Sequence, residues 1–230
     1  MFGIKTLIRE VVTRRKHRLT NDTLIRGLMN HFKADECGHR ADIDFADLGY
    51  GWIHYGLVRC QKPNRILAIG SGYGYIPSLL AQACHDNGIG HVDFVDAGYG
   101  LELRHAGAWV GFWKTIEGQS IFQTFEMGSL KKRITLYNMR TEEFFKKYDN
   151  LVYDYIYIDG DHLYKGIKFD VDHALPLLSK GGFLVLHDIS ILEKQAEGKY
   201  GVERVWKEIA KKNYLEFNHP VSGLGILQKQ

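Results

Sequence analysis

Two short polar stretches bring carboxyl and imidazole groups together at the ends of apolar runs. The stretch 159–162 reads Asp-Gly-Asp-His and follows the run 153–158, and the pair 187–188 reads His-Asp and follows the run 182–186. Burying such groups costs free energy unless they are paired or bind a metal, so packing alone explains them poorly. The titratable side chains concerned are Asp159, Asp161, His162, His187 and Asp188.

These groups have two chemical uses and one structural alternative. Asp159, His187 and Asp188 are candidate ligands of a divalent cation, because carboxylate oxygens suit Mg²⁺ and a histidine nitrogen favours manganese, iron or zinc. Without a metal, Asp161, His162 or His187 is the candidate general base. In the structural alternative, Asp159 and Asp161 cap the next helix by accepting hydrogen bonds from backbone N–H groups. We favour chemistry for the group and leave the role of each histidine open.

A glycine-rich turn provides a second candidate site. The apolar run 66–69 leads directly into Gly-Ser-Gly-Tyr-Gly, and Pro77 then begins a helical pattern that includes 79–83. Glycines let the backbone turn tightly and approach a ligand, and proline suits the first turn of a helix. A strand, a glycine turn and a helix together form a unit that cradles nucleotides. The turn residues concerned are Gly70, Ser71, Gly72 and Gly74.

Asp96 ends the next apolar run, about twenty residues beyond the turn, where a carboxylate can bind both hydroxyls of a ribose. A helix cap or turn is the structural alternative, but the preceding glycine turn favours ribose. The glycine spacing is GxGxG, and Tyr75 stands where a nicotinamide-binding turn has a third small residue. A nicotinamide oxidoreductase is therefore disfavoured.

Alternating strand and helix patterns predict the elements that position these groups. Strands are predicted at 66–69, 91–96, 133–137, 153–158 and 182–186, and helices at 48–61, 164–178 and 201–212. This alternation indicates a parallel sheet covered on both faces, with ligands at the carboxyl ends of its strands. The last two runs, 214–219 and 223–228, predict a hairpin and one antiparallel edge.

Composition and charge exclude several classes of function. The chain has 230 residues and 45% hydrophobic content, which suffices for a full core. A net charge of +3 is too small to indicate nucleic-acid binding, and no apolar run approaches the ~20 residues that span a bilayer. The three cysteines lie far apart without a CxxC pair, which indicates reduced thiols. We expect a cytoplasmic enzyme.

Two segments carry weaker patterns. Residues 1–47 are predicted to form a helical extension, with helices within 3–33 and a polar loop over 34–47. The segment 97–132 is too long for a simple connection and is rich in aromatic residues. It is either a substrate lid or dimer surface, or a helix that packs its aromatic side chains into the core.

Three stretches carry a resemblance to a known family: RILAIGSGYGYIPSLLA, YIDGDHLYKGIKFDVDHALPLLSKGGFLVLHDI and GVERVWKEI. Through them, residues 48–230 resemble the class I S-adenosylmethionine-dependent methyltransferases. The second stretch is similar to small-molecule O-methyltransferases of sugar, macrolide and cephalosporin pathways. The resemblance implies an α/β, Rossmann-like, doubly wound sheet of seven strands in the order 3-2-1-4-5-7-6, with strand 7 antiparallel. It divides the chain into the extension 1–47 and a methyltransferase domain 48–230.

The resemblance also implies roles for particular residues. Asp161 matches the position of the general base in macrolide-type members, and Asp159, His187 and Asp188 match the ligands of magnesium or manganese. Two positions depart from the family: Ala68 stands where an acid helps to hold the methionine amino group, and His187 stands where metal-dependent relatives carry an acid. The residues implied for S-adenosylmethionine are Gly70, Ser71, Gly72, Gly74, Asp96, Met139, Arg140 and Asp159.

The resulting hypothesis is a methyltransferase that transfers the methyl group of S-adenosylmethionine to a hydroxyl of a small polar molecule, a sugar or another natural product. The expected partners are this small-molecule acceptor and, through the N-terminal helices, a second copy of the chain. No nucleic-acid or membrane-spanning role is expected. The alternative, motivated by Ala68, is a non-catalytic binding module that keeps the methyltransferase fold.

Overall fold

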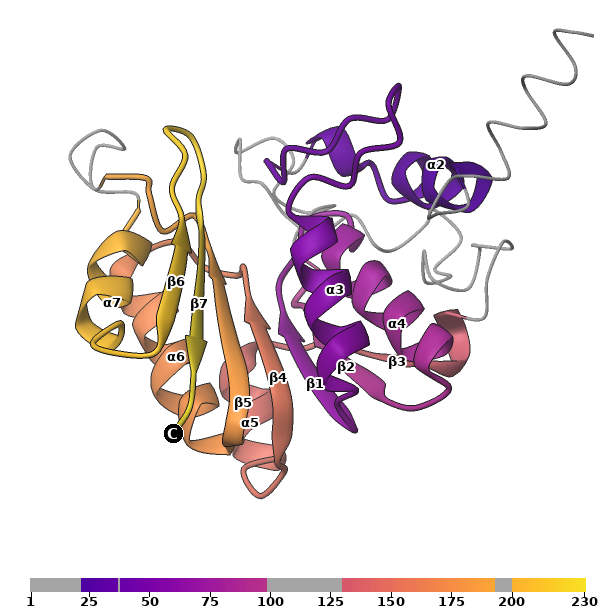
Figure 1. The fold of residues 1–230 in the computed structure, drawn as a ribbon. Coiled ribbons are helices and arrows are strands. Elements are labelled where there is room, and N and C mark those ends of the chain that lie inside the picture. The colour runs from indigo at the N-terminus through magenta and orange to yellow at the C-terminus, as the bar shows by residue number, and fades with distance from the viewer. Residues whose placement is uncertain (1–21, 37, 99–129, 193–199) are drawn as a thin grey trace, which may run out of the picture.

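A mixed sheet organises the residues that the computed structural model describes, which are 22–36, 38–98, 130–192 and 200–230. Within these ranges the sheet has seven strands in the order β3-β2-β1-β4-β5-β7-β6 (Figure 1). The strands are β1 (Arg65–Ile69), β2 (His91–Val95), β3 (Ile134–Tyr137), β4 (Tyr153–Ile158), β5 (Leu178–His187), β6 (Tyr214–Phe217) and β7 (Leu224–Gln228).

The strand directions confirm the predicted topology. β1 pairs in parallel with β2 and β4, while β3 and β5 continue the parallel part at either side. β7 runs antiparallel to both β5 and β6, so the predicted C-terminal hairpin forms the antiparallel edge. The carboxyl ends of the parallel strands therefore meet at one edge of the sheet, where ligand sites of such folds lie.

Helices cover the sheet on both faces, with α3 and α4 on one side and α5, α6 and α7 on the other (Figure 1). The predicted helix with Pro176 near its end is α6, which stops one residue after the proline because an internal proline breaks the helical hydrogen bonds. The helices are α2 (Asp22–His31), α3 (Gly51–Gln61), α4 (Tyr75–Asn87), α5 (Thr141–Lys147), α6 (Tyr164–Leu177) and α7 (Val202–Ile209), with 3₁₀ turns η1 (Ala34–Glu36) and η4 (Leu130–Lys132).

The end of the predicted N-terminal extension packs into the main core. Leu28 and Met29 of α2, and Phe32 just beyond it, are buried in the same apolar cluster as Tyr75 and Leu79 of α4. The boundary between extension and methyltransferase domain at residue 47 stays a prediction. The predicted helix before residue 22 lies outside the described residues, as does most of the segment 97–132.

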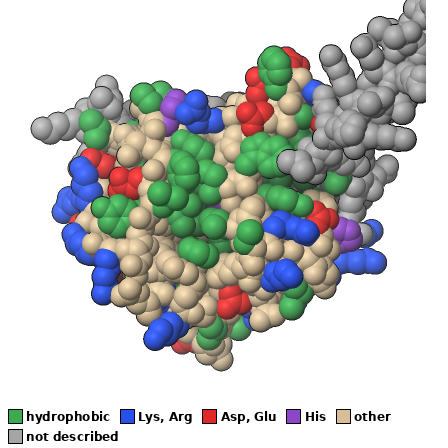
Figure 2. All heavy atoms as spheres, viewed as in Figure 1, with side chains coloured by type: hydrophobic (Ala, Val, Ile, Leu, Met, Phe, Trp, Pro, Cys, Tyr) green, Lys and Arg blue, Asp and Glu red, His purple; other side chains and the backbone are tan. Residues whose placement is uncertain are grey.

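One face of the sheet is covered unevenly. In the view of Figure 1 no described helix lies in front of β5, β7 and β6, and Figure 2 shows hydrophobic side chains gathered over this part of the sheet. Leu215 of β6 is 55% exposed, and Phe217 of β6 and Phe183 of β5 are half-buried. In the described residues no helix is long and apolar enough to cross a membrane.

Two glycines offer opposite tests of the packing. Gly225 of β7 faces α7, and a Cβ at this position would lie 2.7 Å from Cζ2 of the buried Trp206. A Cβ at Gly56 of α3 would meet no atom within 4 Å. We expect Gly225→Ala to lower the free energy of unfolding by about 1–3 kcal/mol through overpacking. The matched Gly56→Ala should raise it by about 0.5–1 kcal/mol, because alanine suits a helix better than glycine.

Chemical denaturation of both variants measures these changes. Equal effects of the two substitutions would contradict the packing of α7 against β7.

Candidate active site

The floor of the site is a backbone contact between the glycine turn and the end of β4. Gly70 has a φ of +63°, and a Cβ here would lie 2.4 Å from the carbonyl oxygen of Asp159. The Asp159 N–H donates to the Ile69 carbonyl over 2.8 Å. Only glycine fits at position 70, since any side chain would push the two strand ends apart. Asp159 is thereby held beside the turn.

A cavity of about 590 Å³ opens above this contact, at the carboxyl ends of β1, β2 and β4. Asp161, His162 and Lys165 belong to its wall, so the cavity continues from the glycine turn to the start of α6. Gly74, which precedes α4, is not among the lining residues. The residues predicted for the cofactor that do line the cavity are Gly70, Ser71, Gly72, Asp96, Met139, Arg140 and Asp159.

Two polar groups in this wall suit a nucleotide-like ligand. The Ser71 hydroxyl is buried and has no hydrogen-bond partner among the described residues, so a bound ligand would satisfy it. Asp96 is held in a turn, where its Oδ1 accepts a hydrogen bond from the Gly98 N–H over 2.7 Å. Asp96 also lines the cavity, where a carboxylate can bind ribose hydroxyls.

Beside the cavity, four titratable side chains converge in what we call the acid–histidine tetrad: Asp159, His162, His187 and Asp188. His162 Nε2 lies 3.1 Å from Asp188 Oδ2 and 3.4 Å from Asp159 Oδ1. His187 Nδ1 lies 3.1 Å from Asp188 Oδ1 and 3.4 Å from Asp159 Oδ1. Each imidazole therefore contacts both carboxylates.

The atoms of the tetrad are close together but are not aligned as hydrogen bonds. Neither His162 Nε2 nor His187 Nδ1 has a hydrogen-bond partner among the described residues. Ligands at right angles around a cation with bonds of about 2.1 Å are about 3 Å apart, which matches these separations. Asp159, His162 and Asp188 bring their ligand atoms within 4.8 Å of one another and fit a metal site. His187 joins Asp159 and Asp188 through its own contacts.

Burial and opposite charges act against each other in the tetrad. Burial lowers the pKa of His187, but the negative charges of Asp159 and Asp188 outweigh it and raise this pKa well above its usual value. Burial lowers the pKa of His162 as well, and the two carboxylates raise it to about 9. Burial raises the pKa of Asp159 and of Asp188, yet the nearby imidazoles bring both below their usual range. The imidazoles and the carboxylates of the tetrad thus stabilise one another's charged forms.

Backbone geometry and a tyrosine fix the two carboxylates. Asp188 has a φ of +62°, in the left-handed region that aspartate tolerates better than most residues. Its N–H donates to the Gly223 carbonyl over 2.8 Å, which ties the end of β5 to the hairpin. The buried Tyr157 donates its hydroxyl to Asp159 Oδ2 over 2.7 Å. Such conformations concentrate at functional sites.

Asp161 lies in the cavity wall but outside the tetrad. Its Oδ1 accepts a hydrogen bond from the Leu163 N–H over 2.9 Å, just before α6 begins. A Cβ at Gly166 would lie 2.1 Å from Asp161 Oδ2, so a glycine in α6 makes room for this carboxylate. The backbone-binding alternative therefore describes this side chain in the structure, and its role as a base stays a prediction.

His39 and Tyr157 contact the tetrad, although neither is marked by a motif in the sequence. His39 comes from the loop before α3, is completely buried, and lies with its ring 4.5 Å from the ring of His187. Burial, together with the charge of His187, lowers the pKa of His39 to about 3. No motif marks His39, because its position depends on how the loop folds back. In the sequence, Tyr157 is marked only as one residue of the predicted strand 153–158.

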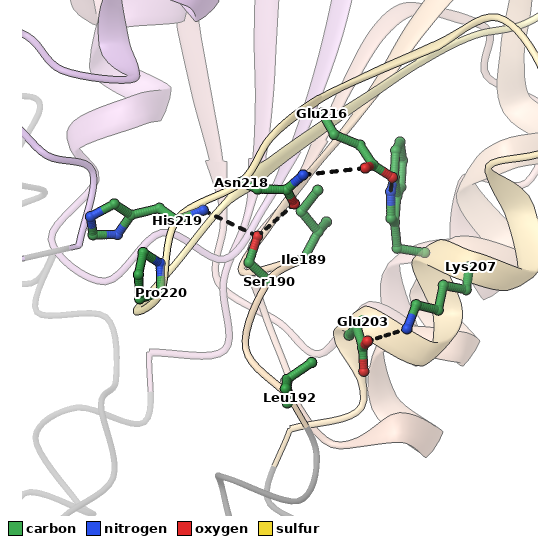
Figure 3. A pocket seen from close by; sticks show the side chains of 10 residues that line it. Ile189, Ser190, Leu192, Glu203, Lys207, Glu216, Asn218, His219 and Pro220 are labelled. Carbon is green, nitrogen blue, oxygen red and sulfur yellow. Dashed lines mark hydrogen bonds and ion pairs between the residues drawn. The ribbon is translucent and has the colours of Figure 1, made fainter.

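A second cavity of about 390 Å³ lies between the end of β5, α7 and the hairpin, and its wall includes Ile189 and Leu192 (Figure 3). Its polar groups are already paired: Trp206 Nε1 donates to Glu216 Oε1, Ser190 Oγ to Asn218 Oδ1, and Lys207 to Glu203. With its polar side chains paired in this way, the cavity is a weaker site candidate than the first.

Asp170 of α6 gives the site a pH-dependent stability. Its carboxyl is buried in the cavity wall, and burial raises its pKa to about 7 despite a hydrogen bond with Thr141. The unfolded carboxyl titrates near pH ~4, so the folded state loses stability as the pH rises from about 4 to 7. Asp170→Asn removes this charge, and we expect it to raise the free energy of unfolding at pH 8 by about 2–4 kcal/mol.

Thermal and urea unfolding at pH 5 and pH 8 measures this gain, which should be smaller at pH 5. The control is Asp172→Asn, a carboxylate of the same helix that is paired with Lys168 at the surface, and it should change stability by less than about 1 kcal/mol. A gain for Asp170→Asn that does not vary with pH would contradict the assignment.

The fold of the chain is that of solved methyltransferases. An O-methyltransferase from Bacillus cereus in complex with SAH has a TM-score of 0.60 at 16% identity, over 93% of this chain and 94% of that one. The SAH-bound methyltransferase PaMTH1 of Podospora anserina has a TM-score of 0.58 at 17% identity, over 100% and 98%. The O-methyltransferase TomG of Streptomyces achromogenes, in complex with SAM, has a TM-score of 0.56 at 15% identity over both whole chains.

Comparison of the sequence with known proteins shows the family of the chain as well as its fold. An uncharacterized protein of Sinorhizobium fredii is 26% identical over an alignment of 192 residues. The match covers 80% of this chain, and the chain spans about a fifth of that protein's length. The model of the methyltransferase domain family matches residues 67–189, more than half of the chain, including the glycine turn and the whole tetrad. The chain therefore belongs to the methyltransferase domain family.

Proposed function

We propose that the chain transfers the methyl group of S-adenosylmethionine to a hydroxyl of a small molecule. The observation that carries this proposal is the shared wall formed by residues 159–162. This wall closes the cavity next to the glycine turn and also supplies Asp159 and His162 to the tetrad. A cofactor pocket and a centre able to deprotonate a hydroxyl therefore adjoin, as methyl transfer to oxygen requires. The neighbours from Bacillus cereus and Streptomyces achromogenes, named as O-methyltransferases, support the same chemistry.

The cavity residues fit the parts of this cofactor. The methionine part would lie against Gly70 and Gly72, where the orphaned Ser71 hydroxyl can bond its polar end. Asp96 would accept hydrogen bonds from the ribose hydroxyls, and Met139 would lie beside the adenine. Ala68 is buried in the apolar core beneath the turn and is not among the residues that line the cavity.

The protein itself would orient the acceptor hydroxyl and accept the proton that this hydroxyl loses. S-adenosylmethionine supplies a methyl group that is already activated by the sulfonium charge. We assign the base to the neutral form of His162, because it lines the cavity and has a side chain that is 30% exposed. A cation at the centre would favour this neutral form, because it would balance the charges of Asp159 and Asp188 in place of the imidazole proton. His187 is buried behind it, with 3% of its side chain exposed, and is better placed to hold the two carboxylates.

A divalent cation fits the same centre. Both imidazoles lie at ligand separations from Asp159 and Asp188. We assign the buried His187 to the cation together with these two carboxylates, and leave the more exposed His162 as the base. The cation would supply Lewis acidity that lowers the pKa of an acceptor hydroxyl. The described residues give no support to the non-catalytic alternative, since the glycine turn and the tetrad adjoin at one cavity. A cytoplasmic location and a homodimer through the N-terminal helices also remain proposals.

The ribose assignment of Asp96 can be tested by calorimetric titration of S-adenosylmethionine and its demethylated product. We expect Asp96→Ala to weaken both affinities by about 10- to 100-fold, because hydrogen bonds to a carboxylate contribute about 1.5–3 kcal/mol. Glu143→Gln, an exposed carboxylate change on α5, should leave both affinities unchanged. Absence of binding to the wild-type protein at millimolar concentration would contradict the proposed function itself.

The role of His162 can be separated from metal binding by one variant. We expect His162→Phe to lower methyl transfer at least about 100-fold, measured with methyl-labelled S-adenosylmethionine and a panel of sugars and phenols, because the base is lost. Its Mn²⁺ affinity should stay within about threefold of the wild-type value. If Mn²⁺ affinity is lost instead, His162 is a metal ligand, and if turnover is unchanged, it has neither role.

A further inference from the structure

His39 is a buried imidazole that the proposed reaction leaves unexplained. The side chain is 0% exposed, and neither ring nitrogen has a hydrogen-bond partner among the described residues. Its Nε2 lies 3.8 Å from Asp159 Oδ2, and its ring packs against those of His187 and Tyr75. Burying a polar group without a partner costs about 1–3 kcal/mol, so this arrangement calls for a ligand.

The loop that carries His39 is built to hold it there. The Tyr50 N–H donates to the His39 carbonyl over 2.8 Å, and a Cβ at Gly49 would lie 2.2 Å from that same carbonyl oxygen. Further along, Asp42 and Asp47 exchange two backbone hydrogen bonds that close the loop. The backbone on both sides of the carbonyl therefore fixes the imidazole next to the tetrad.

Arg26 adds a second anchor from α2. Its guanidinium donates to the carbonyl oxygens of Ile43 and Asp44, so the loop is tied to the helix that precedes it. His39 thus lies on a loop before α3 that α2 holds in place, whereas the residues of the tetrad lie at the ends of β4 and β5. Two separate parts of the chain meet at this point.

We propose that His39 is a further ligand of the tetrad's cation and that the centre takes a transition-metal ion such as Mn²⁺ or Co²⁺ in preference to Mg²⁺. This inference rests on the metal centre of the proposed function. A separation of 3.8 Å between His39 Nε2 and Asp159 Oδ2 lies within the range that two ligands of one cation can have, since their bonds of about 2.1 Å allow up to ~4.2 Å. The cation would also satisfy the orphaned nitrogen.

The donor set explains the preference. Mg²⁺ is held mostly by carboxylate oxygens and water and dehydrates reluctantly. Imidazole nitrogens suit the later first-row metals, whose affinities rise from manganese toward copper. With His39 beside His187, the nitrogen donors that we assign to the cation equal the carboxylates of Asp159 and Asp188 in number, and the imidazole of His162 lies next to them.

Calorimetric titration of the full chain with Mn²⁺ and with Mg²⁺ tests this inference. We expect the wild-type protein to bind Mn²⁺ at least about tenfold more tightly than Mg²⁺. His39→Phe keeps a ring in the packed site but removes the donor, and should weaken Mn²⁺ binding at least about tenfold while leaving S-adenosylmethionine affinity unchanged. The control is His54→Phe, which removes another fully buried imidazole, one that bonds Tyr155; Mn²⁺ affinity should stay the same.

The outcomes separate the two proposals. If the wild-type protein binds Mn²⁺ and His39→Phe binds it equally well, the His39 inference is wrong and the metal centre stands. If Mn²⁺ does not bind, or Asp188→Asn does not weaken it, the metal centre itself is wrong. Should His39→Phe fail to fold, as judged by circular dichroism, His39→Asn replaces it. Pulsed electron paramagnetic resonance of bound Mn²⁺ should then show one fewer coordinated nitrogen than in the wild-type protein, and an unchanged number would overturn the inference.

Discussion

The burial of two carboxylates side by side is the constraint on which the rest of the site depends. Asp159 and Asp188 end two adjacent parallel strands, so the sheet itself forces their side chains together. Two like charges in a poorly hydrated place repel each other and lose hydration, which only opposite charge or hydrogen bonds can offset. His162 and His187 supply that charge by contacting both acids at once, and the Tyr157 hydroxyl adds a hydrogen bond to one of them.

The same constraint supports the proposed cation. The imidazoles lie at metal-ligand separations rather than in aligned hydrogen bonds, so a divalent cation would balance the same two acids in place of the imidazole protons. The positive φ of Asp188 is strain that persists only because the surrounding hydrogen bonds fix it. The rigid sheet thus maintains an arrangement that no isolated segment would adopt.

The fold, and the site residues that directly follow strands, could be predicted from the sequence. Hydrophobic runs and glycines are local signals, and parallel strands place their ends together, so the meeting of Asp96, Asp159 and Asp188 at one edge followed from pattern alone. His39 could not be predicted this way, because its loop carries no periodicity and reaches the tetrad through contacts with α2 and α3. For Asp161 the sequence pattern indicates a residue type and position that suit a base. In the structure, however, its Oδ1 accepts a hydrogen bond from the Leu163 N–H.

Ala68 is better understood from the charge balance than from the family pattern. Ala68 of β1 lies opposite Tyr157 of β4 in the sheet, and the Tyr157 hydroxyl donates a hydrogen bond to Asp159. An acid at position 68, as in the methyltransferases that the chain resembles, would add a further buried negative charge near the sheet edge where the imidazoles of His162 and His187 already offset the charges of Asp159 and Asp188. Alanine keeps that balance, and it leaves this face of the sheet to the apolar core that also holds Tyr155 and Tyr157. The departure from the pattern and the histidines of the tetrad are therefore consistent parts of one electrostatic arrangement.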